Sequence, residues 1–136
     1  AARAARPDGT IIAADTIVVC AGRRLGKPTD AGDAATMLRL LSGRSHEVIT
    51  GLALRRGPGP ALAAGERTRV FVRELARGEI ERYVGTGEPF GKAGAYAIQG
   101  HAAPFIERIE GCYFNVVGLP VALLFKLFSE LERTKE

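Results

Sequence analysis

The sequence has few of the side chains that build disulfide frameworks or structural metal centres. Its 136 residues include two cysteines and two histidines, and neither Cys20 nor Cys112 belongs to a Cys-x-x-Cys pair. We therefore expect no disulfide scaffold and no structural zinc site, because both need several such side chains at short spacing. Cys20 ends an apolar run and is expected to be a small core residue. Two isolated thiols are typical of a protein in a reducing cytoplasm.

Two further absences restrict the class of protein. No apolar run is long enough to span a bilayer, since the longest, around residues 116–128, is interrupted by Gly118, Pro120 and Lys126. There is also no long basic tract. The formal net charge is +4, but the lysines and arginines are spread along the chain, which favours a solvated surface over a nucleic-acid interface. We expect neither a membrane nor a nucleic acid as a partner.

The composition is typical of a globular protein, and strand patterns alternate with helix patterns along the chain. It is 46% hydrophobic and 25% charged, and its length fits a single domain with a hydrophobic core. Runs of β-branched and alternating residues predict strands at 10–20, 46–55, 66–75 and 105–109. Helical spacing predicts helices between Asp30, an expected N-cap, and Gly43, over 78–84, and from Pro120 onward. This alternation indicates an α/β or mixed α+β fold.

The two ends of the chain carry their own expectations. The chain does not begin with methionine, and the Ala/Arg-rich residues 1–6 are typical of a helix end that Pro7 and Gly9 would stop. An upstream segment is therefore expected, with a natural N-terminus as the alternative. The last helix is expected to bury one apolar face, formed by Val121, Leu124, Phe125, Phe128 and Leu131.

Asp15 stands in the middle of the strand predicted at 10–20, which is expected to be buried on both faces. A carboxylate is costly to bury unless it has a partner or a chemical role. A lone Asp of this kind more often caps a turn or pairs with an arginine. Catalysis or metal binding is the alternative.

The segment 85–100 is rich in glycine and predicts no regular element. Glycine allows backbone N–H groups to line up toward an anion, and Lys92, like Lys27 in Leu-Gly-Lys-Pro, adds a point charge suited to phosphate. The Walker A pattern is absent. Gln99 carries an amide that both donates and accepts, which suits the edge of a base, although a surface role is the simpler interpretation.

The remaining polar and aromatic candidates carry weaker signals. His46 and His101 have no partner at metal-ligand spacing and are expected to be structural or on the surface. Tyr96, Tyr113 and Phe114 fit the core or a cleft equally well.

Six short motifs, taken together and in order, resemble the Maf family of nucleotide pyrophosphatases over residues 10–124. The motifs are Ala-Asp-Thr at 14–16, Leu-Gly-Lys-Pro at 25–28, Leu-Ser-Gly at 41–43 with His-Glu-Val at 46–48 and Thr-Gly at 50–51, Gly-Glu-Pro at 87–89, Lys-Ala-Gly-Ala-Tyr at 92–96 with Ile-Gln-Gly at 98–100, and Val-Val-Gly-Leu-Pro at 116–120.

The resemblance implies an elongated mixed α/β fold, with a twisted mixed sheet flanked by helices and a cleft between two lobes. It implies hydrolysis of nucleoside triphosphates to the monophosphate and pyrophosphate with a divalent cation, Mg²⁺ or Mn²⁺. Homodimers are common in the family, so a homodimer is a further expectation.

The resemblance also assigns roles to individual positions. Asp15 matches the catalytic carboxylate, which acts as proton acceptor and as a metal ligand. Thr16 and Gln99 match positions linked to substrate choice, and two lysines match residues that face the phosphates. The complete set implied to bind substrate is Thr16, Lys27, Glu88, Lys92 and Gln99.

The pairing of Lys-Ala-Gly at 92–94 with Ile-Gln-Gly at 98–100 resembles the branch of the family that acts on dTTP and UTP. The branch acting on 7-methyl-GTP typically has Glu in place of Gln99. Modified pyrimidine nucleotides such as pseudo-UTP and 5-methyl-UTP are implied as further substrates.

The sequence departs from the family pattern in two places. Gly91 stands where many relatives have Asp, and the opening Ser-x-Ser-Pro-Arg-Arg motif is absent, so the first strand of the fold is expected to be missing. This departure supports an alternative hypothesis, in which the chain binds nucleotide or regulates without turning it over.

Overall fold

The structure is a computed structural model that describes residues 9–134, so the helix end predicted for residues 1–6 lies outside the described residues. The elements, in chain order, are β1 (Thr10–Cys20), β2 (Arg23–Leu25), α1 (Ala31–Leu41), β3 (Ser45–Arg56), β4 (Leu62–Val72), α2 (Arg77–Gly85), the 3₁₀ helices η1 (Ala93–Ala95) and η2 (Ala103–Phe105), β5 (Ile106–Glu110), α3 (Tyr113–Val117) and α4 (Val121–Thr134).

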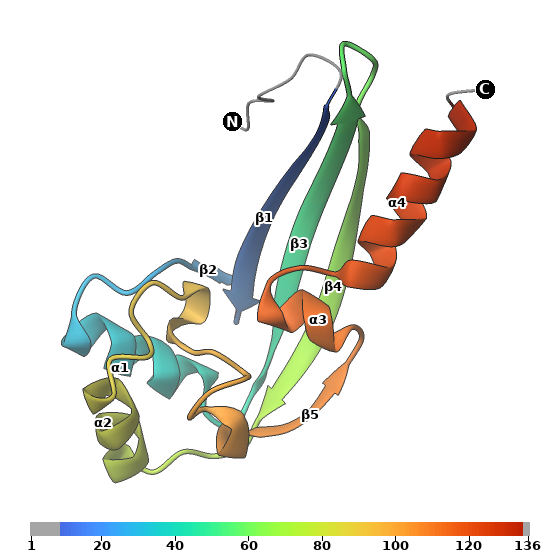
Figure 1. The fold of residues 1–136 in the computed structure, drawn as a ribbon. Helices are drawn as coiled ribbons and strands as arrows, with labels where there is room; N and C mark the ends of the chain where they lie inside the picture. The colour runs from blue at the N-terminus through green and yellow to red at the C-terminus, as the bar shows by residue number, and fades with distance from the viewer. Residues whose placement is uncertain (1–8, 135–136) are drawn as a thin grey trace.

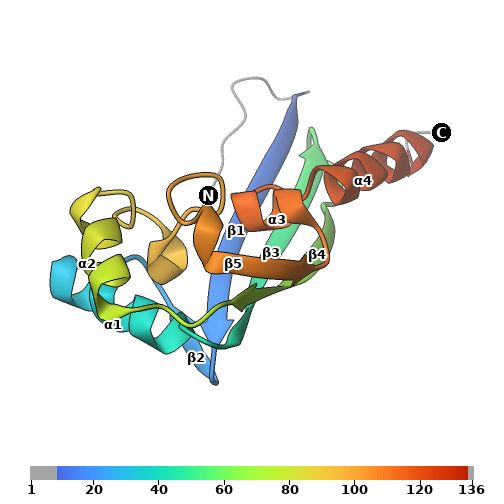
Figure 2. The same ribbon diagram turned by 90° about the horizontal axis from the view of Figure 1, so that it is seen from below.

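The strands form one twisted sheet in the order β2-β1-β3-β4-β5 (Figure 1). The mixed α/β class predicted from the sequence is confirmed. Every pairing between the described strands is antiparallel. The long strands β1, β3 and β4 extend well beyond α1 and α2, which makes the molecule elongated. Figure 2 shows α1 and α2 at one end of the sheet and α4 at the other.

The buried side chains of the long strands all lie on one face of this sheet. In β3 the buried positions alternate, as predicted, through Val48, Thr50, Leu52 and Leu54. Strand residues alternate between faces, and residues paired across two strands share a face. The buried face therefore continues from β1 through β3 to β4, as shown by the pairs Val18–Val48, Val48–Thr68 and Leu54–Leu62. The helices cover it, while the opposite face of β4, with Arg67 and Arg69, is exposed.

Two hydrophobic clusters lie along the covered face. The larger one joins β1, β3 and β4 to α1 and α2, with Leu38 and Leu41 of α1 almost completely buried. The smaller one joins Leu52 and Leu54 of β3 to Leu124 of α4. Helix α1 begins at the predicted N-cap, where the Asp30 carboxylate accepts the Asp33 N–H at 2.7 Å.

The expectation that the strand at 10–20 is buried on both faces is wrong. Only Val18 and Cys20 of β1 are buried, and the stretch from Ile12 to Asp15 is exposed. The physical reason is that the helices within residues 9–134 cover one face of the sheet and reach only the second half of β1, so these residues do not cover its outward side chains.

Several boundaries and one helix face also differ from the predictions. Strand β4 runs from Leu62 to Val72 rather than over 66–75, and the short elements β2 and α3 were not predicted. In α4 the buried leucines are Leu124, Leu127 and Leu131, whereas Phe125 and Val121 are exposed. The helix contacts only the narrow strip formed by β3 and β4, so it buries a narrower face than its apolar content suggests.

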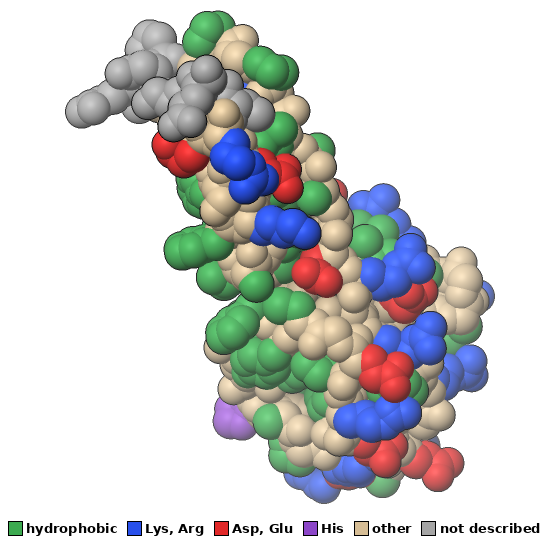
Figure 3. Space-filling model, turned by 90° about the vertical axis from the view of Figure 1, so that its right-hand side faces the viewer, with side chains coloured by type: hydrophobic (Ala, Val, Ile, Leu, Met, Phe, Trp, Pro, Cys, Tyr) green, Lys and Arg blue, Asp and Glu red, His purple; other side chains and the backbone are tan. Residues whose placement is uncertain are grey.

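The α3–α4 side of the molecule exposes large apolar side chains (Figure 3). Those more than a third exposed there are Tyr113, Phe114, Val117, Leu119, Val121 and Phe125. Elsewhere on this view, Lys and Arg side chains alternate with Asp and Glu. None of the helices within residues 9–134 is long and apolar enough to cross a membrane.

A buried asparagine joins α3 to the sheet. The Asn115 amide donates to the carbonyl oxygens of Val48 and Glu66, at 3.1 and 3.3 Å, and to Thr68 Oγ1 at 3.0 Å. Thr68 Oγ1 in turn accepts the backbone N–H of Cys112 at 3.1 Å. This network holds the start of α3 against β3 and β4.

We expect Asn115→Ala to lower the free energy of unfolding by about 3 kcal/mol, because it removes a buried amide that donates to three acceptors. Urea unfolding followed by circular dichroism measures this change. Ser129→Ala is the control, since it removes an exposed hydroxyl that bonds to the Phe125 carbonyl in α4 and should cost little. Equal effects of the two substitutions would contradict the role given to Asn115.

Candidate functional site

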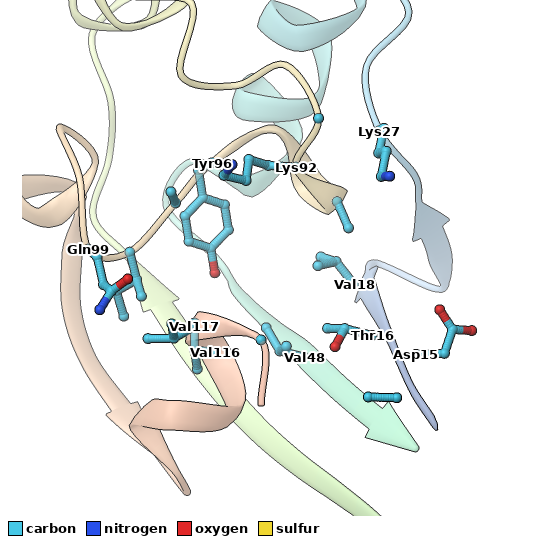
Figure 4. Close-up of a pocket in the computed structure, with 16 residues that line it drawn as sticks. Asp15, Thr16, Val18, Lys27, Val48, Lys92, Tyr96, Gln99, Val116 and Val117 are labelled. Atoms are coloured by element: carbon cyan, nitrogen blue, oxygen red, sulfur yellow. The ribbon is translucent and has the colours of Figure 1, made fainter. Parts of the chain in front are cut away.

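A cavity of about 500 Å³ lies between β1, β3, the segment 91–99 and the end of α3 (Figure 4). Its volume is within the range of small-molecule binding sites. The residues lining it are Ala14, Asp15, Thr16, Val18, Lys27, Val48, Gly91, Lys92, Ala93, Tyr96, Ala97, Ile98, Gln99, Val116, Val117 and Gly118.

The cavity brings together most of the site residues predicted from the sequence, although they are far apart along the chain. Asp15, Thr16, Lys27, Lys92 and Gln99 all line it. Glu88 does not, because its carboxylate lies behind the segment 97–101 and accepts hydrogen bonds from Tyr83 and His101.

Asp15 and Thr16 occupy different positions in the cavity. Thr16 lies on the covered face of the sheet, where its hydroxyl is 2.8 Å from the hydroxyl of its partner Thr50. Its neighbour Asp15 points to the other side of β1, because adjacent strand residues face opposite ways, and it is exposed. No β2 residue pairs with this part of β1, and the Asp15 carboxylate lies on the exposed side of the strand at the rim of the cavity.

The charged and apolar side chains are distributed unevenly around the cavity. In Figure 4, Asp15 and Lys27 lie at one end, and Gln99 lies at the other beside Val116 and Val117. Lys92 projects from the segment between them. The lining therefore carries two cations against one carboxylate among the described residues, which favours an anionic ligand.

The two lysine-bearing loops are joined directly by their backbones. The Gly94 N–H donates to the Gly26 carbonyl at 3.1 Å. Gly94 adopts a φ of 76°, and a side chain there would approach Val18 Cγ1 to 3.1 Å, so glycine allows both the turn and the close approach. Lys27 and Lys92 therefore lie on two neighbouring loops that this hydrogen bond joins.

Tyr96 forms part of the cavity wall and is held by a buried histidine. Its hydroxyl lies 2.6 Å from His46 Nε2, and the two rings meet edge to face. His46 is 2% exposed, so the prediction that it is structural is confirmed. Burial lowers the pKa of His46 to about 4 and raises the pKa of Tyr96 above its ordinary value. Both groups are therefore uncharged at neutral pH.

The apolar wall of the site was not predicted from the sequence. Val18 and Val48 come from the middle of strands, and Val116 and Val117 come from the short helix α3. Nothing in the local sequence of Val18 and Val48 distinguishes them from ordinary core residues, because the register of β1 on β3 brings them together here. The motif at 116–120 was the one available signal.

The acidic side chains around the cavity limit how a metal ion can be held. Within residues 9–134, no three His, Cys, Asp or Glu side chains come together as a metal site, and Asp15 is the one carboxylate that these residues contribute to the lining. Mg²⁺ commonly binds through one or two carboxylates together with the phosphates of a substrate. The residues present fit an ion shared in that way.

Comparison with known proteins identifies relatives of high identity. A family model described as Maf-like protein matches residues 1–131. The chain is 57% identical over 124 residues to the dTTP/UTP pyrophosphatase of Pelotomaculum thermopropionicum, covering 90% of this chain and 65% of that protein.

Two further relatives carry the same description. The dTTP/UTP pyrophosphatase of Syntrophomonas wolfei is 51% identical over 122 residues, which covers 89% of this chain and 65% of that protein. The one from Carboxydothermus hydrogenoformans is 52% identical over 124 residues, covering 90% and 67%. The chain therefore spans slightly less than two thirds of the length of the first two relatives.

We expect the buried His46 to make stability depend on pH. The folded state holds this group neutral down to about pH 4, whereas its ordinary pKa is 6.5. Between these values the unfolded state binds more protons, so stability present above pH 6.5 is lost as the pH falls toward 4, by about 3 kcal/mol. Denaturant unfolding of the wild type and His46→Gln at pH 7 and pH 4 should show their difference shifting by this amount in favour of the variant.

The control for this measurement is Ser129→Ala, because the exposed hydroxyl of Ser129 does not titrate between pH 4 and pH 7. Its difference from the wild type should be the same at both pH values. If the His46→Gln difference is also independent of pH, His46 is not held neutral by burial.

Proposed function

The chain belongs to the Maf family, and from that premise we propose that it hydrolyses nucleoside triphosphates to the nucleoside monophosphate and pyrophosphate. The proposed substrates are dTTP, UTP and modified pyrimidine nucleotides. One observation supports this most strongly. Residues far apart in sequence line a single cavity, with Lys27 and Asp15 at one end, an amide beside an apolar wall at the other, and Lys92 between them.

This polarity suggests how the substrate would lie. The triphosphate would extend toward Lys27, Lys92 and the rim that carries Asp15, because the two ammonium groups offset its negative charge. The base would occupy the opposite end, where Gln99 offers a donor and an acceptor to its edge and Val116 and Val117 present apolar surface. Tyr96, fixed by His46, would form the wall between them.

In the proposed reaction, water attacks the α-phosphorus, the bond from this phosphorus to the bridging oxygen breaks, and pyrophosphate leaves. The Asp15 carboxylate would accept the proton of the attacking water. Lys27 and Lys92 would stabilise the charge that develops on pyrophosphate. A divalent ion, Mg²⁺ or Mn²⁺, held by Asp15 and the phosphates would supply charge neutralisation and ease ionisation of the water.

Other expectations from the sequence stay predictions. These are a homodimer, a cytoplasmic location and the expectation that nucleic acid is not a partner. Binding of nucleotide without turnover is the alternative function, and the following variants separate it from catalysis.

We expect Asp15→Asn to lower the turnover of dTTP by about a thousandfold, because the amide cannot accept the proton. Pyrophosphate release measures turnover, and thermal unfolding checks that the exposed substitution leaves the fold intact. Glu107→Gln, an exposed carboxylate on β5, is the matched control and should remain active. Nucleotide binding by a wild type that releases no pyrophosphate would favour the alternative function.

We expect Lys27→Gln and Lys92→Gln each to raise KM for dTTP by about tenfold, because each removes a cation from the phosphate end. The difference from wild type should shrink at high salt, where charge attraction is screened. Lys126→Gln changes an exposed lysine of α4 and should leave KM unaltered. An equal rise in all three variants would mean that only the overall charge matters.

A further inference from the structure

Glu88 is surrounded by hydrogen bonds that the proposed reaction does not use. Its side chain is half-buried, and it does not line the cavity. We propose that Glu88 and Tyr83 form a brace that holds both ends of the segment 97–101, and that this brace positions Gln99 to select the base. The inference rests on the proposed function and adds two positioning residues to it.

The first arm of the brace comes from helix α2. Tyr83 is 3% exposed, and its ring packs edge to face on Phe105 with centroids 5.3 Å apart. Its hydroxyl donates to Glu88 Oε2 at 2.5 Å and accepts the backbone N–H of Ala97 at 3.1 Å. The hydroxyl therefore joins the carboxylate to the beginning of the segment.

The second arm is the carboxylate of Glu88. While Oε2 accepts from Tyr83, Oε1 accepts the backbone N–H of His101 at 3.0 Å. Hydrogen bonds to an ionised acceptor are stronger than neutral ones. One side chain is thus bonded to the end of the segment and, through Tyr83, to its beginning.

Protonation favours this arrangement at neutral pH. Burial, together with the hydrogen bond to Glu88, raises the pKa of Tyr83, so its hydroxyl keeps the proton that it donates. For Glu88, burial raises the pKa, but the hydrogen bonds from Tyr83 and from the amides of His101 and Ala102 outweigh it and lower the pKa overall. The donor and the ionised acceptor therefore coexist.

Gly100 shows how closely the brace fits the segment. A Cβ atom at this position would overlap Glu88 Oε1, so the carboxylate can reach the His101 amide only past a residue without a side chain. The Gly100 N–H also closes a turn on the Ala97 carbonyl at 3.1 Å. Ile98 and Gln99 are the two residues inside this turn.

The geometry explains why a residue outside the cavity would affect what binds inside it. Gln99 is exposed, and a glutamine on an unrestrained loop would lose conformational freedom on meeting a base. A turn fixed at both ends places its amide before the ligand arrives, and discrimination between bases depends on such placement. The phosphate end, with Lys27 and Asp15, lies across the cavity from Gln99.

A double-mutant cycle tests the proposal. Tyr83→Phe removes the hydroxyl and should weaken binding of α,β-methylene dTTP, an analogue that cannot release pyrophosphate, by about tenfold. In a Gln99→Ala background the same substitution should change binding by less than about twofold, because it acts through Gln99. Binding of inorganic tripolyphosphate, which has no base, should stay unchanged. Titration calorimetry measures all three, and hydrogen exchange should quicken at the Ala97 and His101 amides.

Two further variants complete the test. Gly100→Ala displaces the Glu88 carboxylate while Tyr83 is kept, and it should reproduce the tenfold loss of analogue binding. The proposal therefore stays testable if Tyr83→Phe does not fold. Tyr113→Phe is the matched control, because Tyr113 is exposed and lies outside the cavity lining; binding should not change.

Each outcome has a distinct meaning. Additive effects of Tyr83→Phe and Gln99→Ala, or an equal loss of tripolyphosphate binding, overturn the positioning role while the proposed function stands. A wild type that binds neither nucleotide nor tripolyphosphate and releases no pyrophosphate overturns the proposed function, and with it any role of the brace in base selection.

Discussion

The antiparallel register of β1 on β3 is the constraint on which the rest of the structure depends. It places Thr16 opposite Thr50 and Val18 opposite Val48, so one face of the sheet carries both the core and the floor of the cavity. A shift by one residue would exchange the faces. It would turn Asp15 inward, expose Val18 and separate Gly94 from the strand that it packs against. Burial of this single face therefore specifies the position of every strand residue in the site.

The loops that line the cavity are held by polar contacts rather than by regular elements. The bond between Gly26 and Gly94 joins the two lysine loops, the His46–Tyr96 pair fixes the aromatic wall, and Tyr83 with Glu88 holds the turn that bears Gln99. The contacts of Tyr96 and Tyr83 are buried or half-buried, where an unsatisfied polar group is costly. The irregular segment 85–100 is therefore held in place although it contains little helix and no strand.

The predictions from sequence succeeded where one local pattern determines one outcome. Alternation in β3 predicted its buried face, and Asp30 predicted the start of α1. They failed where the burial of a residue depends on which other elements pack against it. Asp15 was expected to be buried because its neighbours are apolar, but none of the helices in the described part of the chain covers that half of β1. Phe125 was assigned to a buried face, but α4 meets a strip of sheet too narrow to cover it.

The sequence by itself determined the class of fold, the family and the set of polar residues around the cavity. The reason is that motifs and hydrophobic periodicity are local patterns that can be recognised in the sequence alone. Only the tertiary structure decided how those residues are divided. It placed Gln99 and Lys27 at opposite ends of the cavity and Asp15 on its rim, and it set Glu88 behind the turn rather than inside the cavity. These positions depend on strand register and on hydrogen bonds between residues distant in sequence, which no local pattern specifies.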